Sequence, residues 1–576
     1  MLFWLAAWTF VALVYATYLR APISHAYIDF GDGNYQYISW RLTQGVNLYT
    51  DILSPQPPFH LWIGAGLERI SSALGCEPLS AFRWSIHLIR IVTSLLVFGI
   101  AWILFQCGSR ALLAASLFFV LPEGYRWSQG YQSEHLELLF LTLGVLGCLL
   151  RKTATRWVAC WAAVCAIWTN MSALPFSLLI LVIAVAIRPL RWSPLIAAIV
   201  TFAGLAALSV ALAGNAFLEN VWSNQIASIP DSPAAWISSI TAQGSSIIRL
   251  EGLFILLALL GMFLFLRTGP GILGQSTWNN RERGLVTLWG IASVGSAAYV
   301  VKGGTVDYIF TLAEPAVALF AAHALVTSLC GNPFSCKGVE TGGVSDPGEA
   351  STMPVGVLPS VCRIALLVGI ITLLSWEPWQ FNRSVRFQTG SGVDLPNQSD
   401  GRIVEFSDRE VRTVEKIIEG YAQPGKPIWA PPFFAALSKR PLAMDLSETY
   451  LWFVRWASSI YERGSDEGVE EMIEGLTQMI SNTEIPLFLL NSRSGQWGCL
   501  LIPDHSLGGT LTRQLDPRLD RLQKALEEHY HPLLEKPGSD DKLYLQGWNE
   551  RLEVWVPKER ERLLPPSLLK GFLPAS

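Results

Sequence analysis

The sequence predicts a polytopic α-helical membrane protein with a soluble domain at its C-terminal end. The chain of 576 residues is 51% hydrophobic and 15% charged, whereas an ordinary soluble domain contains about 25% charged residues. The charge is also unevenly spread, because 52 of the 88 Asp, Glu, Lys and Arg residues lie in 377–576. We therefore expect the first part of the chain to face lipid and the last part to face water.

Apolar segments recur along the first two thirds of the chain. A helix needs about 20 apolar residues to cross the hydrocarbon core of a bilayer, with a range of roughly 17–25. About eleven segments approach this length, although several of them are short. The expected membrane helices are 2–19, 87–106, 109–122, 136–150, 157–170, 172–187, 193–213, 250–267, 284–301, 308–329 and 363–376.

Lys and Arg residues in the short loops predict the orientation, because basic short loops resist translocation. The loops on one side hold little basic charge beyond Arg126 and Lys302. We expect the opposite, basic side to be cytoplasmic; its residues are Arg110, Arg151, Lys152, Arg156, Arg188, Arg191, Arg267, Arg281, Arg283, Lys337 and Arg363. The first outer loop (20–86), a loop at 214–248 and the region from 377 onward then lie outside.

These spans divide the chain into four parts. Residues 1–330 form a transmembrane domain, and 331–362, rich in Gly, Pro and Ser, form a flexible cytoplasmic linker. Residues 363–376 are the last transmembrane helix. In 377–576 apolar runs alternate with helical patterns, which predicts an extracytoplasmic α/β domain.

Composition excludes some classes of function. The net charge of −4 and the pI near 6.1 give no electrostatic support for a nucleic-acid partner. No pair among the nine cysteines has the CxxC or CxxH spacing of a metal site. We expect the cysteines within apolar segments to behave as small buried hydrophobic residues.

The first outer loop is too long for a simple connection, and long loops are usually functional or disordered. It is rich in aromatic residues, which argues against disorder. Helical apolar spacing at Tyr35–Leu42 and Phe59–Ile70 predicts two helices on the membrane surface, with Trp40 and Trp62 at headgroup depth.

Asp32 stands between Gly31 and Gly33, after His25 and Asp29 and before the first of these helices. Flanking glycines let the backbone turn sharply and leave a carboxylate approachable. The same pattern is also typical of a turn or a helix N-cap that carries no chemistry. From these residues alone both interpretations stay open.

Three motifs in this loop together resemble a known family. They are Asp32-Gly33-x-Tyr35, Gly45-x-x-Leu48-Tyr49-x-Asp51 and Gln56-Pro57-Pro58-Phe59. Their order and spacing resemble the first outer loop of the GT-C glycosyltransferases, and most of all the family of the protein O-mannosyltransferases and the lipid A aminoarabinose transferase. The resemblance covers residues 1 to about 330 and implies a GT-C-like catalytic domain that uses a polyprenyl-phosphate sugar as donor.

Two further segments match the family. Glu134, in Gln132-Ser133-Glu134-His135, matches an acidic residue at the outer start of a helix, although a carboxylate there also suits the helix dipole. Lys302, followed by Asp307 and Tyr308, matches a basic residue in a short outer loop and the tyrosine after it. A lysine at a helix end is also often a snorkelling residue.

The resemblance and the chemistry assign the following roles. Asp32 is the base that activates an acceptor hydroxyl, and Glu134 assists it, positions the acceptor or shares a metal with it. Lys302 and Tyr308 bind the donor phosphate, because a fixed cation stabilises the charge that gathers on it. We expect the site to be lined by His25, Asp29, Tyr35, Arg126 and His135. A divalent metal is compatible with these ligands, but no pair has a diagnostic spacing.

The predicted function is therefore inverting transfer of a sugar, mannosyl or another hexosyl or pentosyl group, to a hydroxyl of a glycan, lipid or protein on the outer face of the membrane. Two alternatives remain. Acidic residues near membrane boundaries, namely Glu251, Asp307 and Glu314, could line a path and so also suit a transporter or flippase of lipid-linked saccharides. The second alternative is a non-catalytic subunit with the same fold. We favour the bacterial inner membrane, because the chain does not end in an ER-retention motif.

Overall fold

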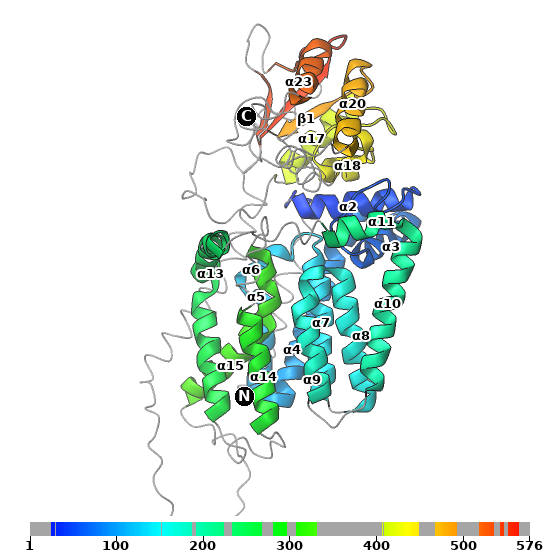
Figure 1. Ribbon diagram of the computed structural model, residues 1–576. Coiled ribbons are helices and arrows are strands. Elements are labelled where there is room, and N and C mark those ends of the chain that lie inside the picture. The colour runs from blue at the N-terminus through cyan, green and yellow to red at the C-terminus, as the bar shows by residue number, and fades with distance from the viewer. Residues whose placement is uncertain are drawn as a thin grey trace, which may run out of the picture.

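In the computed structural model a helical bundle carries a smaller domain at one end (Figure 1). The structure describes residues 25–28, 30–150, 152–186, 192–223, 233–267, 280–295, 307–330, 406, 408–447, 467–491, 518–534, 542–546 and 551–563. The expected helices 2–19 and 363–376, the linker 331–362 and Lys302 lie outside these residues.

Each expected membrane span between 87 and 329 overlaps a helix. The helices of the bundle are α4 (Pro78–Phe105), α5 (Gly108–Val120), α6 (Pro122–Trp127), α7 (Ser133–Leu149), α8 (Thr153–Thr169), α9 (Leu174–Ala186), α10 (Ser193–Ala213), α13 (Pro233–Arg267), α14 (Asn280–Gly295) and α15 (Glu314–Cys330). Short turns and helices join them, namely η2 (Met171–Ala173), α11 (Asn215–Leu218), η3 (Glu219–Ser223) and η5 (Asp307–Ala313).

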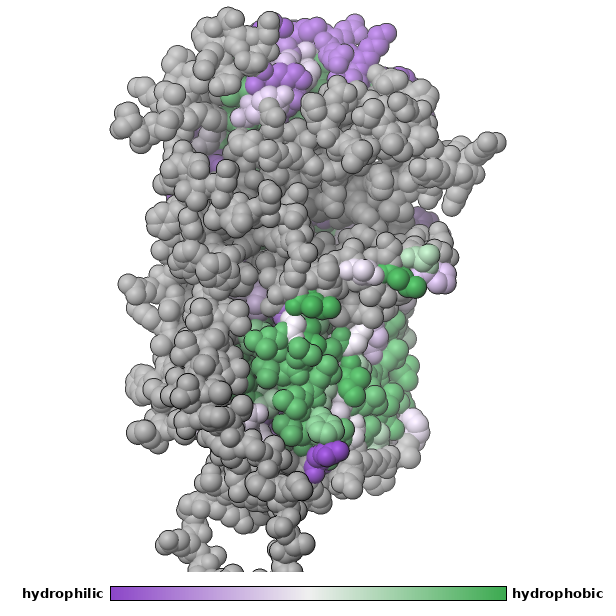
Figure 2. Space-filling model, turned by 90° about the vertical axis from the view of Figure 1, so that its left-hand side faces the viewer, coloured by the Kyte–Doolittle hydropathy of each residue, from purple (hydrophilic) through white to green (hydrophobic). Residues whose placement is uncertain are grey.

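Three helices in the described part of the chain are long and apolar enough to cross a membrane: Pro78–Phe105, Ser193–Ala213 and Phe310–Ser328. The apolar helices Gly108–Phe119 and Met171–Ala186 are shorter. On the face shown in Figure 2, hydrophobic side chains gather on the described part of the bundle and hydrophilic ones at the far end of the other domain. The chain is therefore a membrane protein, while eleven crossings and their orientation stay predictions.

Close helix packing in the bundle depends on small residues. A Cβ atom at Gly261 of α13 would collide with the carbonyl group of Phe320 on α15. The facing side of α15 is rich in buried alanines, including Ala316 and Ala321. Small residues let two helix backbones approach, which is how helices in lipid gain van der Waals contact without a hydrophobic driving force.

The two helices predicted in the first outer loop form a layer between the bundle and the smaller domain (Figure 1). They are α2 (Phe30–Thr43) and α3 (Phe59–Leu74), each longer than expected. The expected headgroup position of Trp40 is wrong. Its side chain is buried, and the Lys439 ammonium group of the smaller domain lies 5.3 Å from its ring centre. Trp62 is 39% exposed on α3.

The segment between α2 and α3 contains the glycine and tyrosine of the second motif. Gly45 and Tyr49 both have positive φ, 86° and 74°, so the chain reverses sharply there. The Tyr49 hydroxyl donates to the carbonyl of Gln56 at 2.8 Å, and its buried ring packs against Phe217 at 5.3 Å. The motif therefore fastens the first outer loop to the end of α10 and α11.

The smaller domain is an α/β domain in its described parts. Its helices are α17 (Asp408–Tyr421), α18 (Pro432–Ser438), η6 (Ala443–Asp445), α20 (Glu467–Ser481) and α23 (Arg518–His529). Its strands are β1 (Phe488–Asn491), β2 (Tyr530–Pro532), β3 (Tyr544–Gln546) and β4 (Arg551–Pro557). All three other strands pair antiparallel with β4, β1 on one edge and β2 and β3 on the other.

One hydrophobic core runs through both this domain and the first outer loop. Tyr27 exchanges two backbone hydrogen bonds with Phe406, at 2.9 and 3.2 Å, and its ring stacks on Phe433 at 4.9 Å. A Cβ atom on Gly33 of α2 would lie 2.6 Å from the Cβ of Phe433 on α18. The glycine beside Asp32 therefore provides a close helix contact.

Polar contacts fix α2 and α3 to the same domain. The Arg41 guanidinium binds both carboxylate oxygens of Asp445, at 2.7 and 2.8 Å, and the Tyr37 hydroxyl donates to Asp445 at 2.5 Å. Lys439 donates to Glu68 at 2.6 Å. Lys439 and Asp445 both have positive φ, a backbone conformation that costs about 1–3 kcal/mol for residues other than glycine and persists only where surrounding contacts hold it.

We predict that Gly33→Ala lowers the free energy of unfolding by about 1–3 kcal/mol, because the new methyl group overpacks the contact with Phe433. Gly66→Ala is the matched control, since Gly66 lies in α3 with open space around its Cβ position. That change should stabilise the protein slightly through helix propensity. Thermal unfolding in detergent measures both, and equal effects would contradict the close contact.

Candidate functional site

Asp32 lies in the first turn of α2 and its side chain is fully buried. Both flanking glycines are part of this helix, so Asp32 is in neither a turn nor an N-cap position. The carboxylate accepts hydrogen bonds from Gln36 at 2.7 Å, from the backbone amide of Tyr131 at 2.6 Å and from Arg83 at 2.7 Å. Fixed donors on both oxygens hold this carboxylate in one orientation.

Arg83 on α4 is the ion-pair partner of Asp32 and is equally buried. Its guanidinium also donates to the carbonyl of Ala26, at 2.9 Å, and to that of Gln129. A Cβ atom on Gly130 would lie 3.2 Å from that of Asp32, so the glycine lets this loop close over the pair. Arg83 thus joins the segment before α2, helix α2 and the loop before α7.

Sequence reasoning missed Arg83, because the expected membrane span began at 87. A signal was available: Arg83, His87 and Arg90 are spaced by four and three residues, which places them on one face of a helix. All three are buried. Arg90 pairs with Glu314 of α15 at 2.9 Å, and the amide of Gly124 donates to the same carboxylate at 2.5 Å.

Glu134 lies in the first turn of α7 and is 2% exposed. Asn170, at the end of α8, donates to Glu134 Oε1 at 2.9 Å and to the Ser133 hydroxyl at 3.1 Å. Glu134 Oε2 is buried and has no hydrogen-bond partner among the described residues. One turn on, the buried Glu137 accepts from the Ser172 hydroxyl at 2.9 Å. The turn from α8 to η2 therefore holds two carboxyl groups of α7.

The structure brings Asp32 and Glu134 to the same loop. The amide of Tyr131 binds Asp32, and Glu134 follows Tyr131 by three residues. Tyr35 also belongs here, since its ring lies edge-on to that of His60 at 4.6 Å. His135 is buried on α7 next to Glu134. That these residues form the site, and the role of each, stay predictions.

One other expected site residue, His25, has a different partner, and the remaining ones lie outside the residues that the structure describes. His25 pairs with Glu77 at 2.6 Å, which leaves it bound to the start of α4. Asp29, Lys302 and the side chains of Arg126 and Tyr308 lie outside the described residues. Across the described ranges no three His, Cys, Asp or Glu side chains are placed to share a metal ion. The described residues therefore provide no set of ligands for the divalent metal that the sequence allowed.

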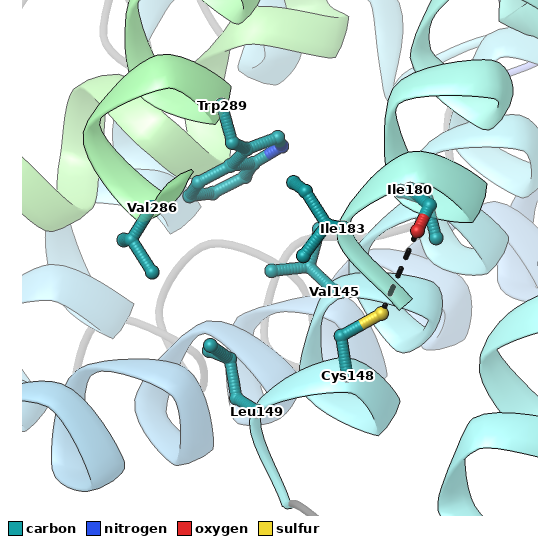
Figure 3. Close-up of a pocket in the computed structure, with 7 residues that line it drawn as sticks. All are labelled: Val145, Cys148, Leu149, Ile180, Ile183, Val286 and Trp289. Carbon is teal, nitrogen blue, oxygen red and sulfur yellow. Dashed lines mark hydrogen bonds between the residues drawn. The ribbon is translucent and has the colours of Figure 1, made fainter. Parts of the chain in front are cut away.

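A crevice elsewhere in the bundle is purely apolar. Figure 3 shows Val145, Cys148 and Leu149 of α7 facing α9 and α14 across it. Its volume of about 10 Å³ has room for about one water, and an apolar cavity of this kind stays dry. The Cys148 thiol donates to the carbonyl of Ile180 at 3.8 Å. Nothing in this crevice supports chemistry.

The overall fold of this chain is shared with solved structures. The apo ArnT of Cupriavidus metallidurans, an aminoarabinose transferase, has a TM-score of 0.52 at 13% identity over 95% of this chain and 97% of that one. The same protein bound to undecaprenyl phosphate has a TM-score of 0.54 at 12% identity and the same coverage. The chain has a GT-C-like fold.

This GT-C fold confirms the resemblance that the motifs of the first outer loop predicted. The apo oligosaccharyltransferase of Archaeoglobus fulgidus covers 94% of this chain and 80% of its own, at 11% identity, with a TM-score of 0.48 that supports no further conclusion. No family model matches the sequence. No curated protein sequence matches it either.

We predict that the pairing of His25 with Glu77 makes stability depend on pH. The hydrogen bond to Glu77 raises the pKa of His25 above 6.5, and it lowers that of Glu77 below 4.5. The His25 contribution is complete below pH 6.5 and is lost as the pH rises through the folded pKa. The Glu77 contribution is complete above pH 4.5 and is lost as the pH falls through its folded pKa.

The contribution of the pair to the free energy of unfolding should therefore be largest between about pH 4.5 and 6.5. We expect it to be less than about 1 kcal/mol, because both side chains are partly in solvent. The measurement compares the unfolding free energies of the wild type and His25→Gln at pH 5.5 and pH 9. Asp408 and Arg412 of α17 also act on His25, with opposite signs. A difference between the two proteins that stayed the same at both pH values would contradict the assignment.

Proposed function

We propose that the protein is an inverting glycosyltransferase that moves a sugar from a polyprenyl-phosphate donor to a hydroxyl acceptor at the outer face of a membrane. The observation that carries this proposal is the carboxylate of Asp32, buried and aimed by Arg83 beneath the smaller domain in a GT-C fold. The ArnT structure bound to undecaprenyl phosphate supports the class of donor.

Asp32 is the general base in this proposal. An acceptor hydroxyl is a poor nucleophile at neutral pH, and a positioned base contributes about 10²–10⁴-fold to the rate. The acceptor oxygen forms its bond to the anomeric carbon as the bond from that carbon to the phosphate oxygen breaks. The electron pair leaves with the phosphate and the hydroxyl proton moves to Asp32. A single displacement inverts the anomeric configuration.

Lys302 and Tyr308 bind the donor phosphate in this proposal. Residues 307–313 form η5, which packs against α6 and α7 and leads into α15. The Arg90 and Glu314 ion pair holds the start of α15 against α4. This contact supports a location for Tyr308 at the same end of the bundle as Asp32. Glu134 Oε2, buried and unpartnered within the described chain, is suited to position the acceptor.

The same proposal places the protein in a bacterial inner membrane with its C-terminal domain outside. Of the acidic residues that suit a transporter, the buried Glu314 is bound by Arg90 and by the amide of Gly124, so it links α4, α6 and α15. Arg83 and the amide of Tyr131 hold Asp32 in the same way, so the match to the family motif, and not these contacts, is what favours Asp32 as the base. A non-catalytic subunit would be expected to lose Asp32 or its fixed donors, and this chain keeps both.

We predict that Asp32→Asn lowers sugar transfer by about 10²–10⁴-fold, since the amide keeps the size of the side chain but accepts no proton. The change also leaves Arg83 without its buried counter-charge, which costs about 3–5 kcal/mol of stability. Glu314→Gln is the matched control, because it breaks the other buried arginine pair outside the proposed chemistry. Transfer is measured per folded molecule, with a panel of polyprenyl-phosphate sugars in liposomes.

The control should keep most of its transfer per folded molecule despite a similar loss of stability. Near-wild-type transfer by the Asp32→Asn protein would refute the assigned base. Transfer by no donor, with folded wild-type protein, would refute the proposed function.

We predict that Lys302→Ala raises the KM for the lipid-linked donor about tenfold or more and leaves the KM for the acceptor nearly unchanged, because it removes a point charge from the phosphate. Lys302→Arg keeps the charge with another geometry, so partial activity is expected. Steady-state kinetics with each substrate varied in turn separate the two constants. An unchanged donor KM in a folded Lys302→Ala protein would assign Lys302 to the membrane interface instead.

A further inference from the structure

His60 on α3 is a buried histidine that the proposed chemistry does not use. Its side chain is 1% exposed, and Nδ1 lies 3.1 Å from the carbonyl oxygen of Thr169. Its Nε2 atom is buried and has no hydrogen-bond partner in the part of the chain that the structure describes. Buried polar atoms without partners are rare in native proteins, so each one needs an explanation.

The protonation of the His60 ring follows from its surroundings. Burial lowers the pKa of His60 from 6.5 to about 3, so the ring is neutral at physiological pH. A neutral imidazole carries one N–H group and one lone pair. Because Nδ1 faces a carbonyl oxygen, Nδ1 carries the proton, and this tautomer is assigned from the hydrogen bond. Nε2 is then an acceptor aimed at no donor among the described residues.

A second open acceptor is held by the neighbouring residue. Thr169 binds the His60 ring, and Asn170 donates to Glu134 Oε1, which leaves Oε2 as the other buried atom without a partner. Consecutive residues at the end of α8 therefore hold a histidine and a carboxyl group that each keep one acceptor atom open. Two open acceptors held by consecutive residues match the hydroxyl groups of a sugar ring.

Tyr131 connects this pair to Asp32. Its backbone amide donates to Asp32 at 2.6 Å, and its hydroxyl at the far end of the side chain donates to the carbonyl of His60 at 2.7 Å. His60 therefore lies about one tyrosine side chain from the proposed base. Tyr35 closes another side of the ring, edge-on at 4.6 Å.

We propose that His60 Nε2 and Glu134 Oε2 form a paired acceptor site that binds carbohydrate hydroxyl groups beside Asp32. This inference deepens the proposed function and rests on it for the location of the reaction. It adds a binding residue, His60, that orients a substrate hydroxyl and takes no part in proton transfer. The hydroxyl groups belong either to the acceptor or to the sugar of the donor, and the experiment separates these two sources.

Two substitutions distinguish a ligand contact from a structural one. Asparagine places its amide near the position of Nδ1, so His60→Asn keeps the contact with Thr169 and loses the acceptor at Nε2. Glutamine reaches the position of Nε2, so His60→Gln keeps an acceptor there and loses the contact with Thr169. A ligand role predicts greater damage in His60→Asn, and a purely structural role predicts greater damage in His60→Gln.

Binding is measured first, by saturation-transfer NMR on the full chain in detergent with a panel of methyl glycosides. We expect wild-type protein to bind at least one glycoside, with a dissociation constant about 3–10-fold higher in His60→Asn and within about twofold in His60→Gln, the effect of losing one hydrogen bond. His531→Asn is the matched control, because His531 makes the same contact with a carbonyl, that of Val556, in the smaller domain. It should bind like wild type.

Kinetics then identify the source of the hydroxyl groups. A rise confined to the acceptor KM in His60→Asn assigns them to the acceptor, and a rise confined to the donor KM assigns them to the donor sugar. Glycoside binding without transfer from any donor would support this site while refuting the proposed function. Absent binding by wild type, or greater damage in His60→Gln than in His60→Asn, would overturn the inference.

Discussion

The buried ion pair of Arg83 and Asp32 is the constraint on which the outer end of this molecule depends. Both side chains are at most 1% exposed, and a charge so far from water is tolerated only when it is paired and hydrogen-bonded. The guanidinium of Arg83 also donates to the carbonyl groups of Ala26 and Gln129. The segment before α2, the start of α2 and the loop before α7 must therefore come together for the pair to be satisfied.

Helix α4 carries two buried arginines, and each forms an ion pair. The buried face of α4 carries Arg83 near its first turns and Arg90 two turns further along the helix. Each arginine binds a carboxylate from another part of the chain. Arg90 also lies over the ring of Phe118 at 4.3 Å. Two fixed charges on one rigid helix set the relative position of α2 and α15. Helix α2 carries Asp32, and α15 follows η5, so both elements are positioned by their contacts with α4.

The sequence predicted the helices well and their partners poorly. Apolar runs and helical spacing located the bundle helices, α2 and α3, because these signals are local. Motif resemblance singled out Asp32 and Glu134, whose roles stay predictions. It did not find Arg83 or His60, because a single basic or imidazole side chain in a long amphipathic or apolar helix has no local pattern that reveals its partner. Trp40 was misplaced for the same reason, since the residues that cover it lie some 400 positions away.

The core shared by the first outer loop and the smaller domain has a consequence for biogenesis. Glu68 and Lys439, which pair across this interface, are separated by 371 positions. At a synthesis rate of about 5–20 residues per second, roughly 20–75 s pass between the synthesis of the first outer loop and that of the domain that covers it. The apolar face of α2 stays uncovered during this time. During that interval Tyr37 and Trp40 are available to chaperones or to neighbouring chains, so insertion of the helices and burial of the outer loop are separate steps.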